Sequence, residues 1–287
     1  MRTVNRIIVT ALAIATCLPA NAQFGNVMGR IGDKLQKGKQ VKDNYTPWTP
    51  EQEEQVGQAS AARLINIFGL YENPDMVRYV NLVGDAVAAQ APRQVPYKFG
   101  ILDTEIITAL SLPGGYVFIT RGALANMTSE AELAGTLAHE VAHVDQRHLE
   151  KEIRSKNSMQ MVQNEVSQFT SGQLQQIASA SVSSALTQHY SRDKESDADR
   201  LGVTFAQKAG YDAGGLRLFL TFLENAPKTP ETQRQLSLWG STHPPFPERI
   251  ASLQAQEATL PSGGVTLEAR YAQHVNAAAW VVKPSGQ

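Results

Sequence analysis

The order of hydrophobic and polar residues predicts a mainly helical chain. Apolar residues recur at helical spacing over 49–68, where Thr49 is placed to cap a helix and Pro50 to begin it. A second helix is predicted from about Asn73 towards Pro92. Similar patterns predict further helices after Ser129 and over 195–209, 212–225 and 245–257.

Between the second and third helices the pattern changes to that of short strands. Residues rich in β-branched and aromatic types occupy 97–102, 106–110 and 116–120. The Pro-Gly-Gly sequence at 113–115 predicts a turn before the last of them. We therefore predict an α+β fold, with a small β-sheet next to the helix that follows Ser129.

That helix has an apolar face and a clear start. Ser129 is a suitable N-cap, and Glu132 completes a capping-box sequence three residues later. Apolar residues then recur as one stripe at Leu133, Leu137, Val141 and Val144. The middle of this helix should therefore lie against the core.

The sequence HEVAH at 139–143 lies in the middle of this helix. His139 and His143 are one helical turn apart, so both rings can bind one metal ion. Glu140 beside them can accept a proton from a metal-bound water, as in HExxH metallopeptidases. The alternative is an ordinary solvated helix face that happens to carry these residue types.

A catalytic zinc site needs a third protein ligand. The other histidines of the chain are His148, His189, His243 and His274. A carboxylate is the better candidate, because Glu195 and Asp199 again lie one helical turn apart. Glu195 would be the ligand, and Asp199 would accept a hydrogen bond from a ligating histidine. The alternative is a solvated acidic helix face made of Asp193, Glu195, Asp197 and Asp199.

Together, the ordered motifs resemble those of the M48 peptidases, a gluzincin family. They are LPGGYVFITRGAL at 112–124, HEVAHVDQRH at 139–148, Ser191 with Arg192, ESDADRLG at 195–202 and STHPPFPERI at 241–250. The resemblance covers about residues 50–255 and implies a zincin-like metallopeptidase domain with one Zn²⁺ per chain. The zinc ligands that it implies are His139, His143 and Glu195. It also implies that Glu140 is the general base and that Asp199 orients a ligand.

The chain departs from the family pattern in one segment. Many members carry Asn-Ala-Phe-Ala where this sequence has Thr108, Ala109, Leu110 and Ser111. The segment resembles the edge strand that pairs with the substrate backbone, and Thr108 and Leu110 keep its β propensity but lose the Asn amide. We expect substrate orientation to differ and zinc chemistry to be retained.

Three further residues lie within these motifs. His148 follows His139 by about two and a half helical turns, so a continuous helix would point it away from the metal, in a structural role. His243 lies in a Pro-flanked loop that the resemblance places near the cleft. It would bind the oxyanion, occupy the fourth zinc position as an inhibitory ligand, which we favour, or only pack. By resemblance, Arg249 anchors this loop by pairing with an acidic residue.

Composition allows a sizeable core and excludes some partners. The chain has 287 residues, of which 42% are hydrophobic and 18% charged, and its formal net charge is -1. This balance lacks the basic excess that binding to nucleic acid or an anionic membrane requires. No stretch after residue 22 is long and apolar enough to predict a transmembrane segment.

Residues 1–22 have the features of a secretory signal peptide. A basic start, an apolar run over 7–18 and the sequence Ala-Asn-Ala before Gln23 follow the usual order. The apolar run is too short for a membrane anchor. Cys17 lies in an imperfect lipobox, so a lipoprotein is the weaker alternative. After cleavage the chain would contain no cysteine and hence no disulfide.

The motifs predict a peptidase domain over 49–257, between a flexible segment at 23–48 and a tail at 258–287 with no assignable role. Within the domain, the stretch 150–190 is rich in Gln and Ser and has weak helical periodicity. It would be a surface helical excursion, or else a mobile flap over the cleft or a partner-binding surface.

We predict a zinc endopeptidase of the bacterial cell envelope, located in the periplasm. Its substrates would be polypeptides, including misfolded or unassembled periplasmic or outer-membrane proteins. The alternative is an envelope chaperone or assembly factor whose zinc site is structural or autoinhibited. The intact Glu140 argues against a purely structural site.

The mature protein should begin at Gln23 and appear in periplasmic extract, because the Ala-Asn-Ala site fits signal cleavage better than the lipobox does. Intact-mass measurement of the exported protein checks this. A lipidated N-terminal Cys17 would contradict it.

Overall fold

The computed structural model describes residues 47–156, 169–187, 190–242 and 246–275. Several predictions lie outside the described residues: the signal peptide with Cys17, nearly all of the segment 23–48, His189 and His243.

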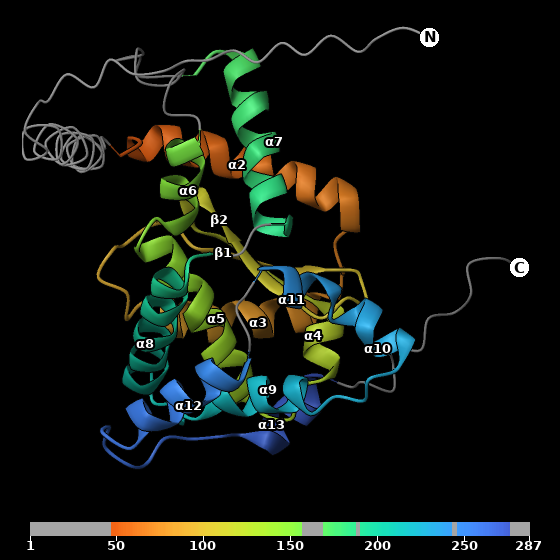
Figure 1. Ribbon diagram of the computed structural model, residues 1–287, viewed down its shortest axis with the longest axis vertical. Helices are drawn as coiled ribbons and strands as arrows, with labels where there is room; N and C mark the ends of the chain where they lie inside the picture. The colour runs from red at the N-terminus through yellow and green to blue at the C-terminus, as the bar shows by residue number, and fades with distance from the viewer. Residues whose placement is uncertain (1–46, 157–168, 188–189, 243–245, 276–287) are drawn as a thin grey trace, which may run out of the picture. The chain divides into compact units, whose positions relative to one another are not determined.

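Helices make up most of the described residues, and one three-stranded sheet accompanies them (Figure 1). The helices are α2 (Pro50–Phe68), α3 (Pro74–Ala88), α4 (Arg121–Ala125), α5 (Glu130–Asp145), α6 (His148–Lys156), α7 (Ser171–Thr187), α8 (Arg192–Lys208), α9 (Gly215–Glu224), α10 (Pro230–Gln235), α11 (Ser237–Thr242), α12 (Phe246–Glu257) and α13 (Glu268–His274). The strands are β1 (Lys98–Leu102), β2 (Ala109–Leu112) and β3 (Tyr116–Thr120), and the short 3₁₀ helix η1 (Pro113–Gly115) precedes β3. The predicted α+β fold is confirmed.

The helix caps predicted at Thr49 and Ser129 are present, and Asn73, near which the second helix was predicted to start, is a cap as well. Thr49 accepts a hydrogen bond from the backbone of Gln52, and Asn73 caps α3 in the same way. Ser129 caps α5, but the carboxylate of Glu132 turns to the backbone and hydroxyl of Thr128 and to the Ser129 hydroxyl. The capping box is thus displaced by one residue. Helix α3 ends at Ala88, earlier than the apolar pattern predicted.

Helix α5, which carries HEVAH, is buried along its whole length from Glu130 to Asp145. It contacts α3, α8, α9 and β2, and Figure 1 shows it among these elements. Helix α8 approaches it closely at Gly202, where a Cβ atom would lie 2.9 Å from the Cα of His139. This close approach brings the acidic residues of α8 to the histidines of α5.

The sheet has the order β1-β3-β2, so β2 is an edge strand. β3 pairs in parallel with β1 and antiparallel with β2, from Ala109 opposite Ile119 to Leu112 opposite Tyr116. The strand predicted at 106–110 is therefore wrong in its bounds, since the paired residues are Ala109–Leu112. The tight turn at η1, where Gly114 has φ 75°, places the residues directly before it opposite β3 and so fixes the register.

The sheet separates two hydrophobic cores. Alternate side chains of a strand face opposite sides. Ala109 belongs to the core with residues of α3, α5, α8 and α9, whereas Leu110 and Leu112 belong to the core with residues of α2, α6 and α7. By this alternation Ser111 lies on the face of β2 that meets α5.

The chain leaves α5 through a tight reversal. Arg147 has φ 53°, a left-handed conformation that costs a non-glycine residue roughly 1–2 kcal/mol. Its side chain offsets this cost by donating to the carbonyl of Trp48 at 3.0 Å and to Glu150 at 3.1 Å. As a result α6 starts in a new direction at His148 instead of continuing α5.

Only part of the stretch 150–190 is described. Its helix α7 packs against α2, α6, α11 and β2, and it buries Ile177 and Val182. This is the packing expected of a surface helix that covers one of the cores.

The beginning of the C-terminal tail packs onto the start of α5. The backbone of Ala131 donates to the carbonyl of Thr266 at 3.1 Å. Helix α13 contacts α3 and α5, and its Arg270 pairs with Glu130. Residues 258–275, to which the sequence pattern assigned no role, therefore support the helix that carries HEVAH.

Glu130 is the centre of this contact and is only 1% exposed. Its carboxylate accepts hydrogen bonds from the hydroxyls of Tyr79 and Tyr211, each at 2.8 Å, and from Arg270. Burial acts to raise the pKa of Glu130, but these donors outweigh it and lower the pKa below its ordinary value of 4.5.

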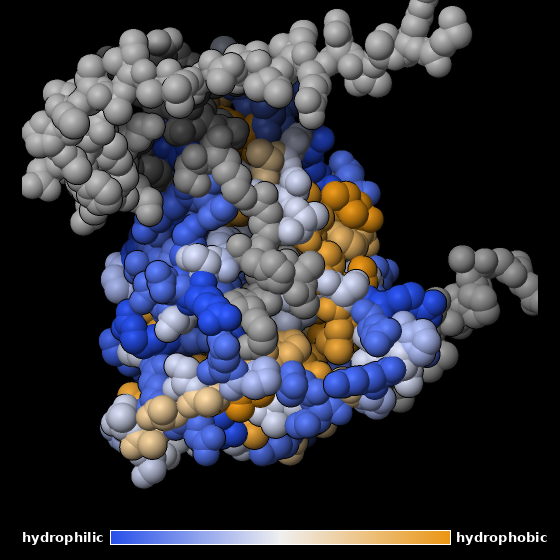
Figure 2. All heavy atoms as spheres, in the orientation of Figure 1, coloured by the Kyte–Doolittle hydropathy of each residue, from blue (hydrophilic) through white to orange (hydrophobic). Residues whose placement is uncertain are grey.

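None of the helices in the described part of the chain is both long and apolar enough to cross a membrane. Figure 2 shows a mainly hydrophilic face, with hydrophobic side chains gathered near the C-terminal end of α2. Ile67 there is 57% exposed and Leu70 is 40% exposed.

Replacing Glu130 by Gln should lower the free energy of unfolding at pH 7 by about 1–3 kcal/mol, because a buried charge-assisted network is lost. The folded-state pKa is the lower one, so the contribution is complete above pH 4.5 and disappears as the pH falls through the folded-state value. Urea unfolding at pH 7 and pH 3.5 measures the difference from wild type. An equal difference at both pH values would contradict this assignment.

Candidate metal centre

Three side chains of ligand type meet beside the middle of α5. His139, His143 and Glu195 are each at most 2% exposed, and one donor atom of each lies within 4.8 Å of the others. The Nε2 atoms of the two histidines are 3.0 Å apart. Glu195 Oε1 lies 3.4 Å from Nε2 of His143, and Glu195 Oε2 lies 3.7 Å from Nε2 of His139.

These separations fit a tetrahedral zinc site. Zinc–ligand distances of about 2.0–2.1 Å place neighbouring donor atoms about 3.3 Å apart at tetrahedral angles. Two imidazoles and one carboxylate are also a ligand set of catalytic zinc sites, in which a fourth position stays open. The structure thus brings together the three residues that the sequence pointed to, in a geometry that could hold zinc.

Asp199 lies one turn along α8 and faces His139. Its Oδ1 is 3.0 Å from His139 Nδ1, the ring nitrogen that faces away from the ligand cluster. Such a contact fixes the tautomer and the direction of a ligating ring. Burial would raise the pKa of Asp199, but Arg249 and His139 hold it well below its usual range, so the carboxylate stays ionised.

Arg249 joins the two acidic residues. It comes from α12, is 5% exposed and donates to Asp199 through Nε at 2.9 Å and Nη2 at 2.6 Å. Its Nη1 lies 3.2 Å from Oε2 of Glu195. The acidic partner expected for Arg249 is therefore Asp199, with Glu195 beside it, and this buried charge is compensated by both carboxylates.

His148 lies closer to the site than predicted. Its Nδ1 is 2.9 Å from Nδ1 of His143, so it contacts the back of a candidate ligand. The expectation that it points away assumed one continuous helix and is wrong, because the chain reverses at Arg147. Burial and the neighbouring His143 lower the pKa of His148 to about 2. A neutral His148 can accept the Nδ1 proton of His143 and so leave Nε2 of His143 free to bind metal.

The ring of Tyr190 covers the face of His143. The two ring centroids are 4.3 Å apart and the planes differ by 22°, while His139 meets His143 edge-on at 4.7 Å. Tyr190 directly precedes Ser191, the N-cap of α8. No sequence motif singled out Tyr190, because its stacking on His143 joins residues that are far apart in the sequence.

Glu140 is 2% exposed and turns towards β2. Its Oε2 accepts a hydrogen bond of 2.8 Å from the hydroxyl of Ser111. Burial raises the pKa of Glu140 above its usual value, while His139 and the Ser111 hydrogen bond act in the opposite direction. The segment that departs from the family pattern therefore touches the expected general base, which its β propensity alone did not indicate.

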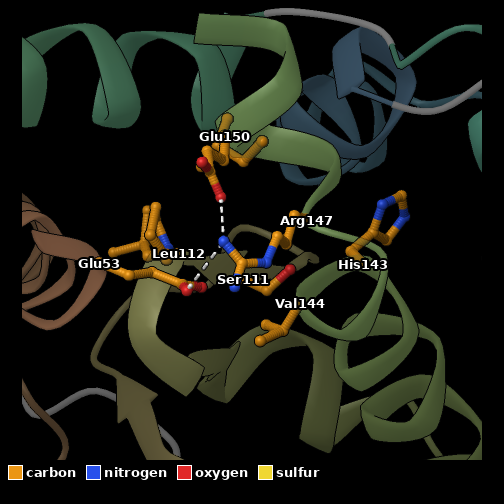
Figure 3. Close-up of a pocket in the computed structure, with 9 residues that line it drawn as sticks. Glu53, Ser111, Leu112, His143, Val144, Arg147 and Glu150 are labelled. Atoms are coloured by element: carbon orange, nitrogen blue, oxygen red, sulfur yellow. Dashed lines mark hydrogen bonds and ion pairs between the residues drawn. The ribbon is translucent and has the colours of Figure 1, made fainter. Parts of the chain in front are cut away.

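A small pocket lies behind the cluster, where the ends of α2, α5, α6 and β2 meet (Figure 3). Figure 3 shows Arg147 reaching towards Glu53 and Glu150, while the ring of His143 points away from them. The charged groups of this pocket thus connect the chain directly after α5 to α2 and α6, and the ring of His143 faces away from them.

One remaining histidine is described and lies elsewhere. His274 stacks on Tyr79 with ring centroids 4.3 Å apart, next to the Glu130 network. It belongs to the contact of α13 and takes no part in the ligand cluster.

Comparison with protein families agrees with this geometry. Residues 74–257, which include every residue of the cluster, match the family model described as Peptidase family M48. The chain belongs to this family. The resemblance found from the motifs is thereby confirmed.

Three individual relatives are between 24% and 28% identical to this chain. The chain is 28% identical over 257 residues, 86% of its length, to the "Putative beta-barrel assembly-enhancing protease" of Vibrio cholerae. It is 24% identical over 260 residues to the "Beta-barrel assembly-enhancing protease" of Escherichia coli. It spans about half of each of these two proteins, 51% and 50%. A "Mitochondrial metalloendopeptidase OMA1" of Schizosaccharomyces pombe is 26% identical over 190 residues, 66% of this chain and 54% of that protein.

Glu195→Ala should abolish stoichiometric zinc binding, whereas Asp199→Asn should retain zinc with an affinity about 10- to 100-fold weaker. The first change removes a candidate donor atom and the second changes only the partner of His139. Competition with a chromophoric chelator measures both affinities. Undiminished zinc binding by both variants would place the third ligand elsewhere.

Proposed function

We propose that this M48 protein is a zinc-dependent endopeptidase of the bacterial envelope. The observation that carries the proposal is the buried cluster of His139, His143 and Glu195, with Glu140 on the same helix as the two histidines. A structural zinc site would need neither an open position nor a carboxylate base beside it. The family match supports the same conclusion.

Each residue of the centre has a distinct role in this proposal. Zinc, when bound, supplies Lewis-acid polarisation of the water and of the scissile carbonyl. Glu140 takes a proton from the water and passes it to the leaving amine, which suits a carboxylate whose pKa is raised by burial. Asp199 and His148 hold the two histidine rings from behind.

The substrate would be an extended polypeptide held next to β2. β2 lies at the edge of the described sheet, with β3 as its strand partner. An edge strand has backbone groups that can pair with an added strand, which is a common way of binding peptides in proteases and other proteins. Because Ser111 of this strand touches Glu140, a peptide paired there would lie close to the candidate base.

Location and substrates are inferred from the N-terminus and the relatives. The sequence of residues 1–22 favours export, which would place the mature chain in the periplasm. Two relatives are named beta-barrel assembly-enhancing proteases. We therefore propose that misfolded or unassembled envelope proteins, including outer-membrane proteins, are substrates of this chain as well.

His243 is proposed as an inhibitory ligand at the fourth zinc position. The residue itself lies outside the described residues, but the helix that follows it is held at the site. Arg249 of α12 binds Asp199, only a few residues after His243. A neutral imidazole in that position would exclude the water on which Glu140 acts.

Zinc-loaded wild type should hydrolyse casein at a basal rate in spite of the inhibitory His243, and chelation should abolish this activity. Glu140→Gln should lower turnover by at least about 100-fold, because the base is lost while every candidate metal ligand remains. Zinc content measured on the same samples is the control. A wild type that cleaves no unfolded substrate, yet prevents its aggregation, would instead support the chaperone alternative.

A further inference from the structure

The hydroxyl of Ser111 is a polar group on a side of β2 that otherwise faces a hydrophobic core. Ser111 is 4% exposed, and its neighbour on the same face, Ala109, belongs to the core around α5. The hydroxyl meets the carboxylate of Glu140 at 2.8 Å. An apolar small side chain would satisfy the packing, so the hydroxyl needs another explanation.

The two oxygens of Glu140 are not equivalent. Oε2 accepts the Ser111 hydrogen bond, whereas Oε1 is buried and has no hydrogen-bond partner within the described part of the chain. A buried carboxylate oxygen without a donor is costly unless another group binds there. The terminal torsion of a glutamate is broad, so a single directed hydrogen bond decides how the carboxylate is turned.

Ser111 is itself firmly held. Its backbone pairs with β3 opposite Val117, and β2 packs against α5, the helix of Glu140. The hydroxyl is therefore a fixed donor, and it is attached to the strand proposed to bind the substrate. Base and strand are connected through one hydrogen bond.

We propose that Ser111 is a positioning residue, which holds Glu140 through Oε2 and leaves Oε1 to take the proton from water. The inference rests on the proposed peptidase function. It predicts that the hydroxyl contributes to turnover beyond any contribution to stability, because the orientation of the base affects the reaction and has little effect on ground-state binding.

Kinetics of the zinc-loaded protein test this role. Ser111→Ala should lower kcat on the order of 10-fold with KM unchanged, and Ser111→Thr, which keeps the hydroxyl, should restore most of kcat. Ser181→Ala is the matched control, because Ser181 is also buried and its hydroxyl donates to the carbonyl of Ile177 in its own helix. A kcat for Ser111→Ala within twofold of wild type at equal zinc content would overturn the proposal.

A second measurement uses the zinc-free protein and needs no activity. Ser111→Ala should reduce the folded-to-unfolded equilibrium constant roughly 10-fold when Glu140 is present and much less in a Glu140→Leu background. Equal effects in both backgrounds would show that the two side chains do not interact, and this would overturn the proposal. An inactive wild type that still shows this coupling would reject the peptidase function and leave the contact established.

Discussion

The HEVAH segment of helix α5 places the side chains of His139, Glu140 and His143 in the interior of the protein, where each of them needs a polar partner. His139 lies against Asp199, His143 against His148, and Glu140 against Ser111. These partners come from α8, α6 and β2, so the packing of three elements around α5 is fixed by the same contacts that orient the candidate active site.

The surroundings of α5 are built to keep this helix in place. Gly202 lets α8 approach the backbone of His139, and the Glu130 network joins the start of α5 to α13. At the other end, the reversal at Arg147 is held by Trp48 and Glu150. A site on a helix that is fixed at both ends keeps its ligands in position before metal binds, which lowers the entropic cost of binding.

Arg249 shows how charge is balanced in such a site. A buried guanidinium would be strongly unfavourable by itself, but here it lies between Asp199 and Glu195. It also links α12 to the candidate metal centre. Arg249 and the acidic residues of α8, some fifty residues apart in the sequence, therefore form one electrostatic unit.

The sequence by itself determined what depends on local periodicity. The caps at Thr49, Asn73 and Ser129, the helix of HEVAH and the one-turn spacing of Glu195 and Asp199 are all set by residues a few positions apart. Only the tertiary structure decided which side chains meet across elements. Ser111 reaches Glu140 because β2 packs against α5, and His148 returns to His143 because Arg147 adopts a left-handed conformation that its contact with Trp48 supports. Both contacts join parts of the chain that are distant in the sequence, which a periodic pattern does not encode.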